Sequence, residues 1–403
     1  MRLFNTQTGT LETVELRDEP LGLYVCGVTP YDTTHAGHAF TYLTFDILIR
    51  YLAFLGQPVT YVQNVTDIDD DILRKSREIG TTWRELGERE TRRFLDDMKS
   101  LHWREPDYYV KATEHTPEMI AMIEPLLENG LAYESNGSVY FSVASDPEFG
   151  KLSHLTLAEM LPIANERGNF PDDPNKRDPL DFVLWQAAQP GEPTWDSPWG
   201  AGRPGWHIEC SAMAARYLGP SFALHGGGSD LIFPHHECEI AQAENSTGVE
   251  PFVRHWVHVG MVGYQNEKMS KSLGNLILVR NELQQYSADA FRLYLFSHHY
   301  RHPWEYIDGE IAGWEDVANQ LAKTVRLRGG SHDDALDPAR YRERFLSALD
   351  EDLYTPSAIE ALTDLGAAIR ESSETRSIET AQESLIELAG ILGLTLAGVA
   401  DQA

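Results

Sequence analysis

Residues 21–38 read Leu-Gly-Leu-Tyr-Val-Cys-Gly-Val-Thr-Pro-Tyr-Asp-Thr-Thr-His-Ala-Gly-His, an apolar run that leads into a turn and a His-Ala-Gly-His motif at 35–38. The apolar run, 21–28, predicts a buried strand. Apolar residues at helical spacing follow over 37–55, and a second β-branched run occupies 59–62. Strand, helix and strand in this order form half of a nucleotide-binding α/β fold, whose ligands bind at the carboxyl ends of the strands.

A second motif, Lys268-Met269-Ser270-Lys271-Ser272, lies far along the chain in a loop flanked by Gly and Asn. It offers two ammonium groups and two hydroxyls on a segment that can close over a triphosphate. The 35–38 motif offers imidazoles at the start of a helix, where free N–H groups and the helix dipole favour anions. Together the two motifs indicate chemistry on the phosphates of ATP.

Composition excludes several classes of protein. The 403 residues are 42% hydrophobic, enough for a sizeable core, and no run approaches the length of a membrane span or a secretory signal. Three cysteines do not suggest a disulfide framework, so we expect a cytoplasmic protein. The formal charge of −29, with 18 acidic against 8 basic residues over 310–403, indicates a solvated acidic surface and disfavours nucleic acid.

The rest of the chain predicts an interrupted α/β domain followed by helices. We expect helices at 83–103, 117–129, 206–218 and about 234–245, and strands at 222–225 and 253–259. A stretch rich in Pro, Gly and Asp, at 145–200, predicts an insertion with long loops. Amphipathic stripes at 340–350, 357–370 and 380–392 suit a small helical bundle.

Four residues with metal-binding chemistry are scattered along the chain. Cys26 ends the first strand, Cys210 lies on the 206–218 helix, and His235 and Glu239 are four apart on one helical face. Two thiolates, an imidazole and a carboxylate suit tetrahedral zinc. The alternative is two buried structural cysteines and a surface His/Glu pair, and spacing alone leaves both interpretations open.

A glycine-rich loop, Gly226-Gly227-Gly228-Ser229-Asp230, also has two interpretations. It lacks the Gly-Lys-Ser/Thr ending of a P-loop, so it is either an ordinary turn or a place where the backbone approaches a ligand. In the second case Asp230 would pair with an ammonium group.

These motifs resemble the class I aminoacyl-tRNA synthetases, and within them the cysteine-activating branch of cysteinyl-tRNA synthetases and the cysteine ligases of mycothiol biosynthesis. The resemblance covers roughly residues 1–310, and the stretches that carry it, besides the two motifs above, are 24–27, 64–70, 205–210 and 226–239. It implies a Rossmann-type catalytic domain over 1–310, with an insertion at about 110–205 and the Lys-rich loop at 268–272, followed by a helical bundle over 311–403.

The resemblance also implies site residues and cofactors. One zinc ion per chain would be held by Cys26, Cys210, His235 and Glu239. His35 and His38 would contact the phosphates of ATP, which binds with Mg²⁺, and Lys268 and Lys271 would neutralise charge as pyrophosphate leaves. Substrate and adenylate would be bound by Cys26, Gly27, Thr29, Thr41, Asn64, Val65, Thr66, Trp206, Gly228, Ser229, Asp230 and Val262.

The two kinds of enzyme in this branch differ in the acceptor to which they transfer the activated cysteine. Three features resemble the mycothiol-type ligase, which joins cysteine to the amine of glucosaminyl-inositol: residues 28–32 with 39–46, residues 166–168, and a short acidic tail without an evident anticodon-binding domain. Two features resemble the synthetase, which uses tRNA: Glu239 within 238–242, and residues 268–275. We expect the amine ligase, as a monomer without a membrane partner.

Two hypotheses from other classes are weaker. A non-catalytic binding module that kept the fold need not retain both ATP motifs together with a complete ligand set. A simpler nucleotidyltransferase also carries a His-x-Gly-His motif, but it has no need of the zinc residues or of Trp206.

Overall fold

A central parallel sheet organises the chain in the computed structural model, which describes residues 1–31, 34–269, 274–329 and 333–397, except for the side chain of Lys268. Five strands lie in the order β11-β10-β3-β4-β5, and every neighbouring pair is parallel. Their bounds are β3 Leu21–Val28, β4 Val59–Val65, β5 Tyr108–Lys111, β10 Phe222–Gly228 and β11 Val253–Val259. The predicted α/β fold with a parallel sheet is confirmed.

Helices cover both faces of this sheet because alternate side chains of its buried strands point in opposite directions. On β3, Leu23 and Val25 join a core with α1 (Ala36–Phe54) and α9 (Ala288–Phe296). Tyr24 and Cys26 face a second core instead. That core is formed with α4 (Thr116–Glu128), α6 (Trp206–Leu218) and α7 (Glu237–Thr247). Cys26 therefore points toward α6.

The insertion is more ordered than its composition predicts. Four antiparallel strands in the order β6-β7-β8-β9 form its sheet: Ala132–Ser135, Ser138–Phe141, Phe182–Ala187 and Gly202–Pro204. One helix of the insertion, α5 (Leu157–Glu166), packs against η4 (Ile232–His236). The predicted long loops occur at 167–181 and 188–201, but α5 and β8 were missed. Strands of three to six residues leave little periodicity among Pro and Gly, and tertiary packing decides them.

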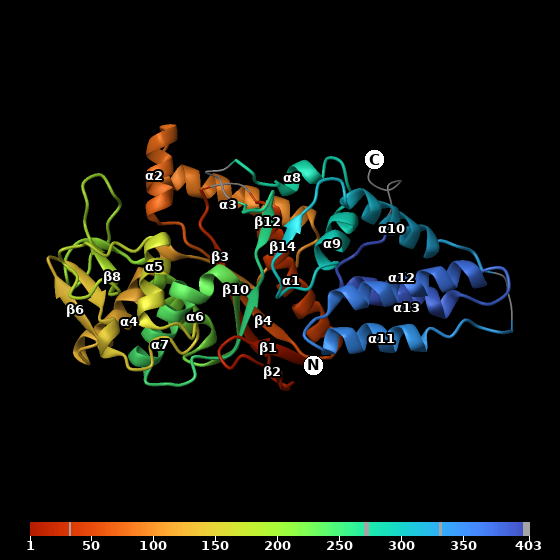
Figure 1. The fold of residues 1–403 in the computed structure, drawn as a ribbon, viewed down its shortest axis with the longest axis horizontal. Helices are drawn as coiled ribbons and strands as arrows, with labels where there is room; N and C mark the ends of the chain where they lie inside the picture. The colour runs from red at the N-terminus through yellow and green to blue at the C-terminus, as the bar shows by residue number, and fades with distance from the viewer. Residues whose placement is uncertain (32–33, 270–273, 330–332, 398–403) are drawn as a thin grey trace.

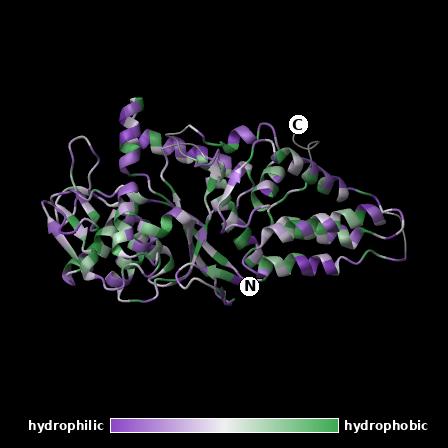
Figure 2. Ribbon diagram, viewed as in Figure 1, coloured by the Kyte–Doolittle hydropathy of each residue, from purple (hydrophilic) through white to green (hydrophobic). Residues whose placement is uncertain are grey.

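The predicted helical bundle is confirmed and gains one helix. It comprises α10 (Ile311–Thr324), α11 (Ala339–Asp350), α12 (Thr355–Ser372) and α13 (Glu379–Ile391). Figure 2 shows hydrophobic and hydrophilic residues mixed along these helices, as expected of amphipathic packing. In Figure 1 the bundle and the insertion lie at opposite ends of an elongated molecule, with the parallel sheet between them.

The remaining elements complete the described chain. They are the antiparallel hairpin β1 (Arg2–Asn5) and β2 (Thr10–Thr13), α2 (Asp70–Ile79), α3 (Trp83–Ser100), α8 (Val279–Glu282), and a small sheet of β12 (Val262–Tyr264), β13 (Glu267–Lys268) and β14 (Trp304–Tyr306). Single turns at η1 (Ala112–Glu114), η2 (Val143–Ser145), η3 (Ser229–Leu231) and η4 (Ile232–His236) link them. Among the described helices, none has both the length and the apolar character needed to cross a bilayer.

Candidate active site

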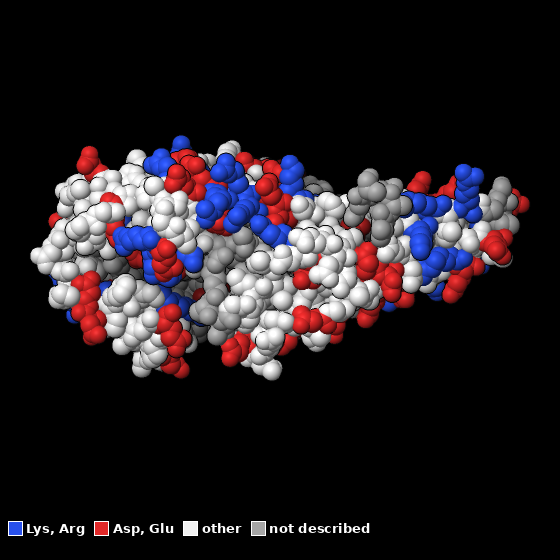
Figure 3. Space-filling model, turned by 90° about the horizontal axis from the view of Figure 1, so that it is seen from above, with Lys and Arg blue, Asp and Glu red and all other residues white. Residues whose placement is uncertain are grey.

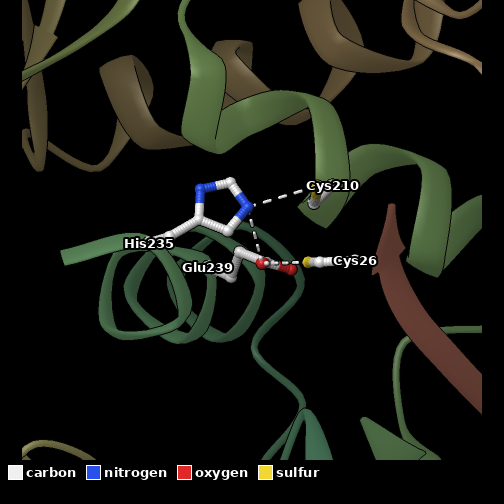
Figure 4. A group of neighbouring side chains, drawn as sticks. All are labelled: Cys26, Cys210, His235 and Glu239. Carbon is white, nitrogen blue, oxygen red and sulfur yellow. Dashed lines mark hydrogen bonds and ion pairs between the residues drawn. The ribbon is translucent and has the colours of Figure 1, made fainter. Parts of the chain in front are cut away.

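Four side chains from four separate elements meet beneath the carboxyl ends of β3 and β10 (Figure 4). Cys26, Cys210, His235 and Glu239 each offer one ligand atom, and these atoms all lie within 4.8 Å of one another. His235 Nε2 is 3.3 Å from Cys210 Sγ and 3.2 Å from Glu239 Oε1, and Cys26 Sγ is 3.3 Å from the same carboxylate oxygen. All four residues are buried.

The chemistry of this cluster fits a divalent metal. Burial raises the pKa of both thiols, Cys26 and Cys210, and of the Glu239 carboxyl, so their charged forms need a compensating cation. A sulfur, sulfur, nitrogen and oxygen donor set is one that zinc takes in tetrahedral sites. The alternative of structural cysteines beside a surface His/Glu pair is wrong in one respect, because His235 and Glu239 are 1% and 0% exposed.

A group of buried histidines surrounds the cluster, and sequence reasoning missed it. His225 Nε2 is 3.0 Å from Glu239 Oε2, and His236 Nε2 is 3.3 Å from Cys26 Sγ. With Cys26 and Glu239 these two histidines form a second set of possible ligands. His258 continues the network, with its Nε2 2.7 Å from His236 Nδ1. Burial lowers the pKa of His225 and His258 to about 3, so both rings are neutral at physiological pH.

A signal for these histidines was present in the sequence. His225 closes the apolar run of its strand, and His236 follows His235 and is three residues before Glu239. His207 lies in the first turn of the helix that carries Cys210, and its Nδ1 lies 2.9 Å from His235 Nδ1. Histidines next to candidate ligands at strand ends therefore indicated the surrounding network.

The 35–38 motif forms the start of α1. His35 is the N-cap, and its Nδ1 accepts a hydrogen bond from Gly37 N at 3.1 Å. Its ring stacks on that of His38 with 3.8 Å between centroids, so the two imidazoles act as one surface. The first N–H groups of a helix attract anions, and the placement suits phosphate oxygens.

Main-chain pairing joins the 35–38 motif to the segment that follows the second motif. Leu278 forms an antiparallel bridge with His35, in which Ala36 N donates to Ile277 O at 2.8 Å and Val279 N donates to Thr34 O at 3.2 Å. Residues 277–279 therefore lie next to the 35–38 turn. In β13 the backbone of Lys268 pairs with Gly263. The Lys268 side chain and all of Lys271 lie outside the described residues.

The ends of β3 and β4 lie beside the cluster of Cys26, Cys210, His235 and Glu239. Asn64 accepts a hydrogen bond from Gly27 N at 2.8 Å and donates to Cys210 Sγ at 3.4 Å. A Cβ on Gly27 would lie 1.6 Å from Asn64 O, so only glycine allows the strands this close. Beyond them the Thr29 and Thr66 hydroxyls are 2.7 Å apart. The strand ends thus form one continuous wall.

The remaining predicted residues lie at the same edge of the sheet or near it. Trp206 stacks on His235 with 4.3 Å between ring centroids. Thr41 donates to Gly37 O at 3.1 Å, so its hydroxyl already has an acceptor within α1. The others are Val65 at the end of β4, Gly228 at the end of β10, Ser229 and Asp230 in η3, and Val262 in β12.

Comparison with known proteins identifies the family. Residues 12–315 match the family described as tRNA synthetases class I (C) catalytic domain, and residues 344–397 match the DALR domain. A cysteine–tRNA ligase of Dehalococcoides mccartyi is 46% identical over 401 residues, covering 98% of this chain and 86% of the relative. An L-cysteine:1D-myo-inositol 2-amino-2-deoxy-alpha-D-glucopyranoside ligase of Thermomonospora curvata is 47% identical over 363 residues, covering 89% and 86%.

Solved structures agree on the fold. Mycobacterium tuberculosis methionyl-tRNA synthetase in complex with methionyl-adenylate matches with a TM-score of 0.65 at 13% identity, covering 93% of this chain and 90% of that one. The chain belongs to the class I (C) tRNA synthetase family. It is a ligase, as predicted. Relatives named for tRNA and relatives named for the amino-sugar inositol acceptor match it at nearly equal identity.

Proposed function

We propose that this protein uses ATP to activate L-cysteine as cysteinyl-adenylate and transfers the cysteine to the amine of glucosaminyl-inositol, releasing AMP and pyrophosphate. The observation that carries the proposal is the buried group of two cysteines, a histidine and a glutamate, in which the Cys26 carbonyl accepts a hydrogen bond from Tyr42 of the helix that starts at the 35–38 turn. A thiol-selective metal site beside a phosphate-binding helix start is what cysteine activation requires.

In the first step the carboxylate of cysteine attacks the α-phosphorus of ATP, forming the C–O–P bond of the adenylate while pyrophosphate departs with Mg²⁺. The stacked imidazoles of His35 and His38 contact the phosphates, and Lys268 and Lys271 offset the charge on the leaving group. In the second step the neutral amine of the acceptor attacks the activated carbonyl, and AMP leaves. Positioning and charge stabilisation dominate both steps.

Cys26, Cys210, His235 and Glu239 would hold a zinc ion whose role is recognition of the substrate thiolate. The serine hydroxyl is a much weaker zinc ligand than the cysteine thiolate. Serine would therefore lose the bond to zinc that cysteine makes, and a loss of this kind can favour one substrate over another by up to about 10⁴–10⁵-fold. A pocket that distinguished substrates only by their size would favour one similar substrate over another by roughly 10–200-fold. The buried histidines support this role, because ligands of a metal site are oriented by hydrogen bonds from such neighbours.

Charge supports a small acceptor over a polyanion. The formal charge is −29, and several basic residues on the outer helices have acidic partners: Arg74 contacts Asp71 and Glu78 on α2, and Arg93 contacts Glu90 on α3. On the face shown in Figure 3, Lys and Arg are interspersed with Asp and Glu. Binding of nucleic acid depends on clustered, unneutralised cations. A monomer in the cytoplasm, where ATP and Mg²⁺ are available, completes the proposal.

A second candidate is a cysteine–tRNA ligase. The position of Glu239 within the cluster favours it, because this residue resembles the synthetase pattern, and so does the 46% identity to a relative of that name.

One experiment separates the two acceptors. AMP release by zinc-loaded protein with ATP and cysteine is measured with glucosaminyl-inositol or with tRNA. We expect stimulation by the amine, with product mass equal to the acceptor plus cysteine less water. Stimulation by tRNA alone would overturn the acceptor, and no cysteine-dependent ATP–pyrophosphate exchange would overturn the proposal as a whole.

A further inference from the structure

The insertion reaches the segment that carries the proposed cysteine site. This segment, Asp230 to Glu239, bends at Phe233, where φ is −136° and ψ is 135° and helical geometry is interrupted. Just beyond α5, the guanidinium of Arg167 donates to the main-chain carbonyls of both Asp230 and Phe233. Two carbonyls at an irregular turn thus obtain their donor from the insertion.

Glu237 makes a second connection from the other side. Its carboxylate is 1% exposed and accepts main-chain hydrogen bonds from Gly150 at 2.9 Å, Leu152 at 3.2 Å and Ser153 at 2.7 Å. The three donors belong to one turn of the insertion. A buried carboxylate is stable only when such donors surround it, so this turn and the start of α7 hold each other in place.

Apolar packing adds a third connection. Met160 and Ala164 on α5 form a small buried cluster with Phe233, the residue at the bend. Glu237 lies two residues from each proposed metal ligand, whereas His235 and Glu239 share a helical face. The insertion therefore contacts the side of this segment opposite His235 and Glu239. These contacts fix the direction in which the helical face that carries the two proposed ligands points.

We propose that Arg167 and Glu237 are positioning residues through which the insertion holds His235 and Glu239 at metal-binding distance and so sets the affinity for zinc and for cysteine. The inference rests on the proposed function. Neither residue touches the ligand atoms. Metal sites tolerate displacements of only a few tenths of an ångström, so loosening the segment weakens the site without removing a donor.

The test compares Arg167→Ala and Glu237→Gln with the wild-type protein. The readouts are zinc affinity by chelator competition, the visible spectrum of the cobalt-substituted protein, and KM for cysteine and for ATP in pyrophosphate exchange. We expect zinc affinity to fall about 10–100-fold, as for other groups that orient metal ligands. KM for cysteine should rise at least fivefold, with KM for ATP within twofold.

Arg177→Ala is the matched control, because Arg177 stacks on Tyr133 at 3.9 Å elsewhere in the insertion. It should leave every readout unchanged. Should Glu237→Gln fail to fold, Arg167→Ala decides alone, because Arg167 is exposed. Folded variants with wild-type zinc affinity and wild-type KM for cysteine would overturn the inference while leaving the proposed function intact. A wild-type protein that binds no zinc would overturn both.

Discussion

His35 and Leu278 form an antiparallel β-bridge, which places the segment after the lysine-rich loop against the helix start that carries both motif histidines. Arg280, two residues on, donates to Asp97 of α3 at 2.9 Å and fastens the same segment from its other side. The loop that begins at Lys268 is therefore attached at both ends, by β13 and by this bridge.

The proposed contact of the 35–38 motif with phosphate predicts a selective kinetic defect. Replacing His38 with Ala should lower the rate of cysteine-dependent pyrophosphate exchange about 10²–10³-fold, because a positioned donor to developing charge is lost. Zinc content and KM for cysteine should stay within about twofold, since His38 is not among the metal-site residues. His154→Ala, at an exposed histidine of the insertion, is the control. A full rate in His38→Ala would refute the role.

Removing one thiolate should abolish metal binding and catalysis together. We expect Cys210→Ala to lose stoichiometric zinc, measured by elemental analysis, and to lose cysteine-dependent exchange. Cys238→Ala provides the control, because Cys238 is also buried, at 2% exposure, but lies outside the cluster. Exchange that persists in a zinc-free Cys210→Ala protein would contradict thiolate recognition by metal.

Zinc affinity should rise with pH. Burial raises the pKa of Cys26, Cys210 and Glu239, so without a metal the protonated forms of these groups are favoured. Metal binding must displace those protons, and each displaced proton contributes about a tenfold change in affinity per pH unit. Chelator competition between pH 6 and 8, corrected for the chelator's own titration, measures the slope. A flat profile would show that the ligands are already ionised.

The junction between the parallel sheet and the helical bundle should be sensitive to one buried arginine. Arg292 is fully buried, pairs with Asp46, and donates to Leu101 O at 2.8 Å and Leu392 O at 2.9 Å. Arg292→Met should lower the free energy of unfolding by about 3–5 kcal/mol, because it leaves buried acceptors unpaired.

Denaturant unfolding checks this value, with Arg344→Ala as the control. Arg344 pairs with Asp364 on the exposed surface of the bundle, and its loss should cost less than about 1 kcal/mol. An equal decrease in the free energy of unfolding of the two variants would contradict the larger contribution expected from the buried Arg292–Asp46 pair.

The local hydrophobic pattern was enough to predict the helices and strands that are long and periodic. The strand 21–28, the helix that follows the 35–38 motif and the three amphipathic helices of the bundle all lie where the sequence predicts them. Each has a hydrophobic repeat that matches its own geometry, so neighbouring residues contain the information. The short strands of the insertion carry too few residues for such a repeat, and only their pairing in β6 to β9 defines them.

The sequence by itself determined the α/β class, the position of the His-Ala-Gly-His turn and the kinds of side chain available for a metal. Tertiary structure decided that Cys26 and Cys210 meet, because β3 and α6 are far apart in the chain and only sheet order brings them together. It also decided that His225 and His236 surround the cluster and that Arg167 reaches the bend at Phe233. Contacts between distant segments depend on how layers pack, and no local repeat encodes that packing.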